Sequence, residues 1–409
     1  MSSTPDLNNL AFRAALGRGL VSRRAAMLGF AGLGVAALSA CGSEGRGGNA
    51  GTGDGSAAPA ATQEDLSDSE KVVNWSNWPE YIDVDDDGER PSLVAFTAAT
   101  GITVNYTDDY NDNDEFYAKV RPLLEAGEDT GRDTWCSTDW MVARLIRQGY
   151  LQELNYDNIP NADNLVDSLK DVEFDSGRKF SLPWQSGFAG IAWNPASTGG
   201  KAIESIDQLL NDPALKGRVT LLTEMRDTVG LVLLDLGKDI TSFTAEDFDE
   251  AIAVIQDAKD RGQLLGFTGN DYTQSLASGD IAACIAWTGD VVQLQYDNPD
   301  LGYALPEKGC TLWSDNWVIP AMAKHKKNAE LLINHYFDPA VMAEAAAWIN
   351  YIPPVKGTDE ALMEIDPEIA GNELILPSDE VLSRAHVFRG LTDQEETDFT
   401  AKFQAIVVG

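Results

Sequence analysis

Tryptophan precedes a carboxylate by two or three residues in three separate segments of this chain: Trp78 before Glu80 in "NWPEYI", Trp287 before Asp290 in "AWTGDV", and Trp313 before Asp315 in "LWSDNW". A carboxylate in a dry cleft needs a cationic partner, because otherwise the loss of its hydration is uncompensated. An aromatic face attracts an ammonium group by roughly 0.5–2 kcal/mol and also packs against methylene groups. Each pair alone also fits a structural role, since aromatic side chains fill cores and acids cap helices. Their recurrence indicates one shared site for a cation with an apolar body.

Further acidic and aromatic side chains extend this pattern. Three aromatics stand in comparable segments: Tyr81 in "NWPEYI", Trp140 in "STDWMV", and Tyr351 in "INYIPP". Glu224 and Asp227 lie three residues apart in "TEMRDTVG", where a predicted strand passes into a helix. Acids are favourable in the first turn of any helix, because its N-terminus carries partial positive charge. This pair therefore fits either a helix cap or a second acidic wall of the site.

Metal binding and catalysis find little support in the sequence. "DVDDDG" (residues 83–88) matches the first half of a calcium-binding EF-hand loop, but Val94 stands where the bidentate glutamate belongs. We expect an exposed acidic loop there, with no metal and no cofactor. The three histidines lie away from the acid–aromatic segments, and no common catalytic motif is present. Acids and tryptophans also suit sugars, so a two-carboxylate glycosidase or a sugar-binding protein remains an alternative, although neutral sugars do not require four convergent acids.

The first forty residues have the composition of an export signal. Arg23 and Arg24 lead into the apolar stretch "AAMLGFAGLGVAALSA", which ends in small residues before Cys41. "LSAC" resembles a bacterial lipobox, which predicts that Cys41 is lipid-modified after cleavage. We expect a signal peptide over 1–40 and a Gly-, Ala- and Ser-rich flexible linker over 41–69. The paired arginines fit Tat export, and Sec export stays open.

The remaining chain is strongly acidic and contains three cysteines. The full sequence has 30 basic and 65 acidic residues, and removing 1–40 leaves 26 minus 64, or −38. Such a charge argues against nucleic acid or anionic headgroups as partners. Cys284 lies in the apolar run "IAACIAW" and is expected to be a buried thiol. Whether Cys136 and Cys310 pair is left open by their spacing.

Strand-like and helical segments alternate from residue 70 onward, which predicts an α/β fold with mostly parallel sheets. "KFSLPWQSGFAGIAWN" interrupts the alternation as one long extended segment, after which a second α/β set follows. We expect a two-lobed α/β fold, in which each lobe is a mostly parallel sheet flanked by helices and extended crossings between the lobes form the hinge. The first lobe is predicted over 70–187 plus 289–333 and the second over 188–288 plus 334–409. Ligands in such sheets sit beyond the carboxyl ends of strands, so the site is expected between the lobes.

From about residue 70 to 409 the chain resembles the spermidine/putrescine-binding proteins of bacterial polyamine ABC transporters. The matching segments are "NWPEYI", "ATGITVNY", "SLPWQSGFAGIAWN", "AWTGDV" and "PEKGCTLWSDNWVIP", in family order. The resemblance implies that Trp78, Glu80 and Tyr81 form a first ligand wall and that Thr138 and Trp140 contact the ligand after the third strand. It also implies an acidic pair, Glu224 and Asp227, and two tryptophan–aspartate sets, Trp287 with Asp290 and Trp313 with Asp315. Tyr351 is implied as an aromatic contact late in the chain. Pro79 departs from the Ser, Thr or Gly usual in the family, which removes a possible hydrogen-bond donor.

The resemblance implies a solute-binding lipoprotein of an ABC importer rather than an enzyme. We expect a monomer, anchored on the outer face of the cytoplasmic membrane, that binds a polyamine between its lobes and delivers it to permease subunits. The alternative is a protein of the same fold that binds another cationic or zwitterionic solute, or a sugar. The preference for spermidine or putrescine is not predicted, because it depends on distances between acids across the cleft.

Overall fold

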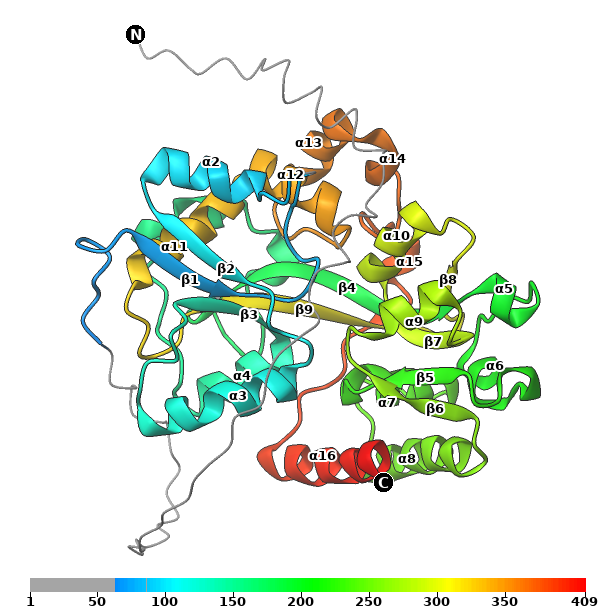
Figure 1. Cartoon of the computed structure of the whole chain (residues 1–409). Helices are drawn as coiled ribbons and strands as arrows, with labels where there is room; N and C mark the ends of the chain where they lie inside the picture. The colour runs from blue at the N-terminus through cyan, green and yellow to red at the C-terminus, as the bar shows by residue number, and fades with distance from the viewer. Residues whose placement is uncertain (1–62, 86) are drawn as a thin grey trace, which may run out of the picture.

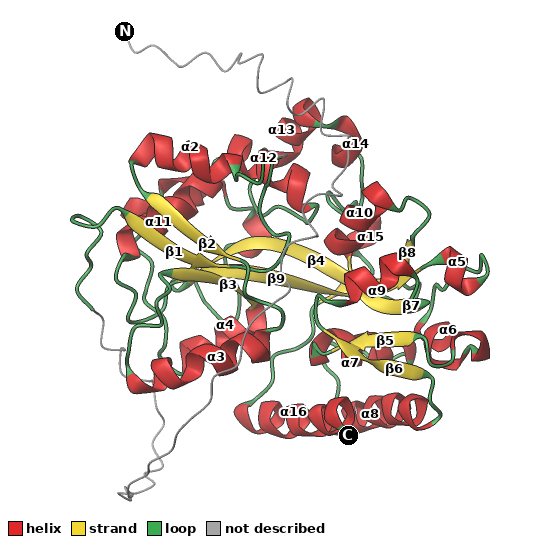
Figure 2. Ribbon diagram, viewed as in Figure 1, coloured by secondary structure: helices red, strands yellow, loops and turns green. Residues whose placement is uncertain are grey.

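A ten-stranded mixed sheet runs through the computed structural model, which describes residues 63–85 and 87–409 (Figure 1). Eight strands follow one another in the order β2-β1-β3-β9-β4-β7-β5-β6, while β8 pairs with β4 and β10 with β9. Helices flank this sheet, as Figure 2 shows. The predicted α/β fold is therefore confirmed. The predicted signal peptide and the predicted lipidation site at Cys41 lie outside the described residues.

The N-terminal elements form a parallel unit at one end of the sheet, here called the first half (residues 72–147). It consists of β1 (Val72–Ser76), α2 (Pro91–Thr100), β2 (Thr103–Thr107), α3 (Asn113–Ala126), β3 (Thr134–Thr138) and α4 (Asp139–Arg147). β1 pairs parallel with both β2 and β3. Gly101 and Gly127 end α2 and α3 in left-handed backbone conformations, which glycine adopts without steric cost.

A second parallel unit lies at the other end of the sheet, here called the second half (residues 206–287). It consists of α6 (Ile206–Asn211), β5 (Val219–Leu222), α7 (Met225–Asp235), α8 (Ala245–Asp260), β6 (Leu264–Thr268), α9 (Tyr272–Ser278) and β7 (Ala283–Trp287). β5 pairs parallel with both β6 and β7. The carboxyl ends of these strands meet at one edge, and α10 (Thr288–Asp297) and β8 (Gly302–Ala304) follow.

Two long antiparallel strands connect the halves: β4 (Ser181–Trp193) and β9 (Cys310–Val318). β9 pairs with β3 of the first half, and β4 pairs with β7 of the second half. Every residue of β4 is buried, including the polar Ser181, Gln185 and Ser186. At Gly187 a Cβ atom would come within 2.6 Å of the Trp313 ring and 2.8 Å of the Tyr351 ring. Glycine in the crossing strand therefore lets two aromatic rings lie directly against the backbone.

The C-terminal helices divide between the two halves. α11 (Lys326–Tyr336) and α12 (Pro339–Ile349) pack against β1 and α2, whereas α16 (Asp393–Val408) packs against α8 (Figure 1). The remaining short elements are α5 (Pro195–Thr198), α13 (Thr358–Ile365), α14 (Pro367–Ala370), α15 (Asp379–Leu382), β10 (Ala385–His386) and four 3₁₀ turns. The predicted boundary between residues 333 and 334 falls inside α11. We therefore propose that α11 and α12 move with the first half.

The end of the predicted linker packs onto the folded body. The Leu66 amide donates to the Lys324 carbonyl oxygen over 2.7 Å, and the Ser67 hydroxyl accepts from the Asn328 amide over 3.1 Å. Leu66 thus bonds the residues just before α11, and the buried Ser67 bonds the first turn of α11 itself. A flexible segment is predicted only from composition, and composition does not register such docking.

Three local features of the described residues bear on the thiols, on metal binding and on membrane spans. Cys136, Cys284 and Cys310 are buried free thiols, so Cys136 and Cys310 do not pair. Among residues 63–85 and 87–409, no group of three or more His, Cys, Asp or Glu side chains is arranged to hold a metal ion. Within the same residues, every helix is too short or too polar to cross a membrane.

Candidate ligand-binding site

A cavity with about 410 Å³ of empty space, including open solvent at its mouth, lies where the two halves face each other. Ten of the twelve side chains predicted to contact ligand line it: Trp78, Tyr81, Thr138, Glu224, Asp227, Trp287, Asp290, Trp313, Asp315 and Tyr351. The structure adds Pro79, Asn113 and Asn270 to the lining and places Glu80 and Trp140 outside it. Among the described residues that line the cavity there are four carboxylates and no lysine, arginine or histidine.

Strand ends account for the convergence of these side chains. Thr138 and Trp287 are the last residues of β3 and β7, and Glu224 and Asn270 follow β5 and β6 by two residues. Because the carboxyl ends of parallel strands meet at one edge of a sheet, residues distant in sequence arrive at one place. The same rule applied to β6 would have identified Asn270, although no acid–aromatic pair marks that segment.

Asp290 lies in the first turn of α10, and three side chains donate hydrogen bonds to its carboxylate. The hydroxyl of Tyr272 and the amide of Asn270 each donate to Oδ2 over 2.7 Å, and the hydroxyl of Tyr351 donates to Oδ1 over 2.9 Å. Burial, aided by the charge of Glu80, raises the pKa of Asp290 to about 6 despite these hydrogen bonds. This carboxylate is therefore fixed in orientation and short of positive charge.

Asp315 forms a second fixed carboxylate on β9. The hydroxyl of Thr138 donates to Oδ1 over 2.7 Å, and the hydroxyl of Tyr81 donates to Oδ2 over 3.1 Å. Burial, aided by the charges of Asp139 and Asp227, raises the pKa of Asp315 to about 7 despite these two hydrogen bonds. Its two donors come from the first half, so Asp315 belongs to that wall of the cavity.

Glu224 and Asp227 line the opposite wall, at the start of α7. Glu224 caps this helix by accepting from the Arg226 backbone amide over 3.2 Å, and it also lines the cavity. Both roles that the sequence suggested for the pair, helix cap and cavity wall, therefore apply to Glu224. Asp227 accepts from the Trp287 indole over 2.8 Å and from the Thr311 hydroxyl over 2.5 Å. Burial raises the pKa of Glu224 to about 8 and also raises that of Asp227.

Aromatic rings form a continuous wall between these acids. Ring centroids lie 6.3 Å apart for Trp78 and Trp287, 6.5 Å for Trp287 and Trp313, and 5.3 Å for both Trp313–Tyr351 and Tyr81–Tyr351. Most of these contacts are edge-to-face, the arrangement that aromatic quadrupoles favour. A Cβ atom at Gly289 would lie 2.2 Å from the Tyr351 ring, so glycine is required for this packing. The wall can contact both methylene groups and ammonium groups.

The two predicted residues outside the lining occupy different surroundings. Glu80 is exposed, with a left-handed backbone (φ 52°) and a carbonyl oxygen that accepts from the Gln293 amide over 3.2 Å. The half-buried Trp140 donates its indole N–H to Glu224 over 3.1 Å, and the guanidinium of Arg226 lies 3.9 Å from its ring centroid. Trp140 therefore stands behind the acidic wall instead of facing the cavity.

The free energy of unfolding of the free protein is expected to fall as pH rises from about 4 to about 8. In this interval the buried acids Asp290, Asp315 and Glu224 hold protons in the folded state that they have lost in the unfolded chain. Rising pH therefore favours the unfolded chain, by about 1.4 kcal/mol for each unit of pKa difference. Urea unfolding at pH 5 and pH 8 measures the effect. Asp315→Asn removes one of these groups and should show a smaller fall, and an equal fall would contradict the assignment to Asp315.

Comparisons with known proteins identify relatives of this chain. The family described as "Bacterial extracellular solute-binding protein" matches residues 92–373, which is more than half of the chain. Spermidine/putrescine-binding periplasmic protein 1 of Haemophilus influenzae is 29% identical over 309 residues, covering 76% of this chain and 81% of the relative. Putrescine-binding periplasmic protein PotF of Escherichia coli is 28% identical over 341 residues, covering 79% and 87%.

Solved structures show the same fold. PotD, a spermidine/putrescine ABC transporter substrate-binding protein from Streptococcus pneumoniae, superposes with a TM-score of 0.66 at 23% identity, covering 82% of this chain and 98% of its own. The TpPotD lipoprotein of Treponema pallidum gives a TM-score of 0.68 at 20% identity, covering 83% and 99%. The family match over residues 92–373 and the shared fold together assign the chain: it belongs to the bacterial extracellular solute-binding protein family.

Proposed function

We propose that this protein binds a polyamine of the spermidine/putrescine class between its halves and delivers it to the permease of an ABC importer. The observation that carries the proposal is the lining of the cavity, in which the buried Asp227, Asp290 and Asp315 and the half-buried Glu224 stand among aromatic rings, with no basic side chain among the described lining residues. Arg226, outside the lining, lies 3.9 Å from Glu224, so the three aspartates are the acids that most lack a cation. A ligand that supplies the missing cations would compensate the desolvation of these acids. The printed functions of the Haemophilus influenzae and Escherichia coli relatives support the same ligand class.

Binding is achieved by fixed acids and an apolar wall, with no chemical step. Each ammonium group loses its bound water and pairs with a carboxylate. The other hydrogen-bonding positions of that carboxylate are already occupied by hydroxyl, amide or indole donors. The ammonium charge lowers the raised pKa values of Asp290 and Asp315, so the acids ionise as ligand enters. The methylene groups of the ligand then lie against the rings of Trp78, Trp287 and Trp313. Closure of the halves is favoured only by the extra affinity that ligand has for the closed form.

A second candidate function is suggested by two indole groups. In the part of the chain that the structure describes, Nε1 of Trp78 and Nε1 of Trp313 are buried without a hydrogen-bond partner. A buried donor without an acceptor is costly, so a ligand that also carries an acceptor oxygen would gain from them. This favours a zwitterionic solute, such as an amino acid derivative with an ammonium group, as the alternative ligand class.

A thermal-shift panel of diamines, triamines, zwitterionic amino acids and sugars tests the proposal. Putrescine or spermidine is expected to raise the melting temperature most, since a ligand at 100 times its Kd adds about 2.7 kcal/mol to the free energy of unfolding. A shift with zwitterions alone would favour the second candidate. A shift with sugars alone would exclude a cationic ligand.

We further propose that the protein is lipid-anchored through Cys41, in line with the lipobox resemblance of "LSAC" and with the TpPotD lipoprotein among its structural neighbours. Replacing Cys41 by serine is expected to release the protein from membranes, because it removes the thiol that carries the lipid. Fractionation of cells that produce each form measures the effect. The polyamine affinity should be unchanged, and membrane retention of the variant equal to that of the parent would disprove the anchor.

A further inference from the structure

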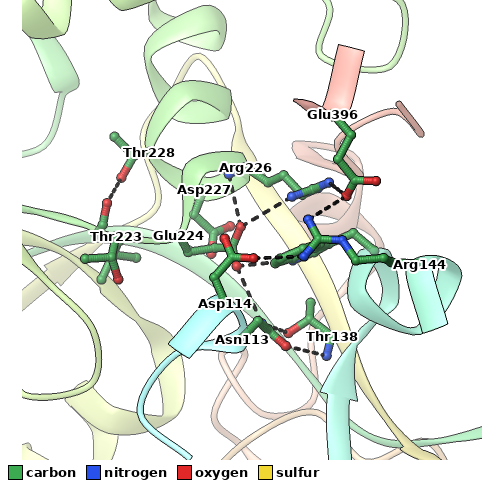
Figure 3. Close-up of polar contacts among 12 residues, drawn as sticks. Asn113, Asp114, Thr138, Arg144, Thr223, Glu224, Arg226, Asp227, Thr228 and Glu396 are labelled. Atoms are coloured by element: carbon green, nitrogen blue, oxygen red, sulfur yellow. Dashed lines mark hydrogen bonds and ion pairs between the residues drawn. The ribbon is translucent and has the colours of Figure 1, made fainter. Parts of the chain in front are cut away.

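A buried carboxylate on α16 forms ion pairs with three arginines outside the ligand cavity. The Glu396 side chain accepts from Arg144 over 3.0 Å, from Arg147 over 2.6 Å and from Arg226 over 3.2 Å. Figure 3 shows Glu396 facing the guanidinium groups of Arg226 and Arg144. The side chains of Glu396, Arg226 and Arg144 are only 10%, 12% and 14% exposed, so these charges are largely removed from water. Each arginine also has a second acid nearby, with Asp114 2.9 Å from Arg144, Asp393 2.9 Å from Arg147 and Glu224 3.9 Å from Arg226, and Glu396 is the acid that all three share.

This cluster joins elements that lie on opposite sides of the cleft. Arg144 and Arg147 belong to α4, which packs against β3 and β9, whereas Arg226 begins α7 in the second half. Glu396 lies on α16, which packs against α8 of the second half. Its contacts with α4 therefore cross between the halves. By contrast, the ion pair of Lys402 and Asp249 connects α16 to α8 without crossing.

The cluster also reaches the cavity wall through Trp140. The guanidinium groups of Arg226 and Arg144 lie 3.9 Å and 4.9 Å from the Trp140 ring centroid, and each arginine bonds Glu396. The Trp140 indole in turn donates to Glu224, which lines the cavity. Trp140 comes from the first half and Glu224 from the second, so this hydrogen bond also crosses the cleft. The arginines thus hold Trp140 at the position from which it orients Glu224.

We propose that Glu396 is a positioning residue for ligand binding, which acts through its three arginines to hold the two halves closed. This inference rests on the proposed function only in that a ligand binds between the halves. Glu396 and its three arginines do not line the cavity, so we expect them to act chiefly on the population of the closed form, which every ligand shares. A lower population of the binding-competent form weakens every ligand by the same factor.

The test compares Glu396→Gln with Asp249→Asn, which removes the same charge from an exposed pair within one side of the molecule. Dyes on Ala98→Cys of α2 and Ala253→Cys of α8, two exposed positions, report the distance between the halves by energy transfer. Without ligand, Glu396→Gln is expected to lengthen this distance, whereas Asp249→Asn should leave it unchanged. Arg147→Gln removes the most exposed of the three arginines and should act in the same direction with a smaller effect.

Affinities for putrescine and spermidine provide the second readout. Glu396→Gln is expected to weaken both by the same factor of about ten, as a tenfold drop in the closed population requires. A parent-like distance in both Glu396→Gln and Arg147→Gln, or an equal change in Asp249→Asn, would overturn the inference. A loss confined to one of the two amines would overturn it as well, because it would place Glu396 in ligand selection. If the parent itself binds neither amine, the proposed polyamine function fails, while the distance measurement still decides the role of Glu396.

Discussion

Replacing Asp315 or Asp290 by asparagine is expected to weaken polyamine binding by two to three decades. Each carboxylate is buried in the cavity wall and held by neutral donors alone: hydroxyls for Asp315, and two hydroxyls and an amide for Asp290. Asparagine keeps the size of the side chain but removes the charge that compensates a dehydrated ammonium group. Breaking a buried pair costs about 3–5 kcal/mol, and roughly 1.4 kcal/mol corresponds to a tenfold change in Kd.

Isothermal titration with putrescine and spermidine measures this loss. The exposed Glu80, just outside the cavity lining, provides the comparison, since an exposed pair contributes only about 0–1 kcal/mol. Glu80→Gln should therefore lose tenfold or less. The melting temperature of each free variant should equal or exceed that of the parent at neutral pH, because a buried uncompensated charge has been removed. Parent-like affinity in both aspartate variants would move the cation site elsewhere.

Trp287→Ala is expected to produce the second large loss of polyamine affinity. Trp287 lies at the centre of the aromatic wall, between Trp78 and Trp313, and its indole N–H holds Asp227 over 2.8 Å. Alanine removes the face that packs on the ligand and leaves Asp227 with Thr311 as its remaining side-chain donor. The lost cation–π contact and the lost burial of methylene groups together amount to roughly 2–4 kcal/mol.

The roles of the Trp287 ring and of its N–H are separated by Trp287→Phe. Phenylalanine keeps an aromatic face but cannot donate to Asp227, so it should recover most of the affinity that alanine loses. Because Trp287 is only 9% exposed, urea unfolding of each variant must be measured beside the binding titration. An alanine variant that is less stable but binds polyamines like the parent would assign Trp287 to the core.

Local sequence determined the order of elements and much of the cavity. The alternation of strands and helices, with Gly101 and Gly127 ending α2 and α3, follows from periodicity and backbone sterics within a few residues. Parallel strands bring their carboxyl ends to one edge, so acid–aromatic pairs that follow strands were expected to meet there. Trp287 with Asp290 and Trp313 with Asp315 do so.

Only the tertiary structure decided which neighbouring side chains face the cavity. Glu80 and Trp140 lie within two residues of lining residues, yet Glu80 turns outward with a left-handed backbone and Trp140 lies between arginines. Asn270 has no sequence signal of its own, and it lines the cavity because β6 ends beside β5. The direction in which a side chain points at a strand end depends on the residues that pack behind it, and these residues are distant in the sequence.

The contacts across the cleft likewise could not be predicted from local sequence patterns. Glu396 and Arg144 are separated by 252 residues, and Trp140 and Glu224 by 84. Composition treats Glu396 as one of 65 acids, and the capping box of Thr392 and Glu395 marks only where α16 begins. Its burial against three arginines arises because α16 returns to α8 and reaches α4 at the same time. Sequence periodicity determines the helix, whereas the surface that the helix meets is set by the packing of the whole chain.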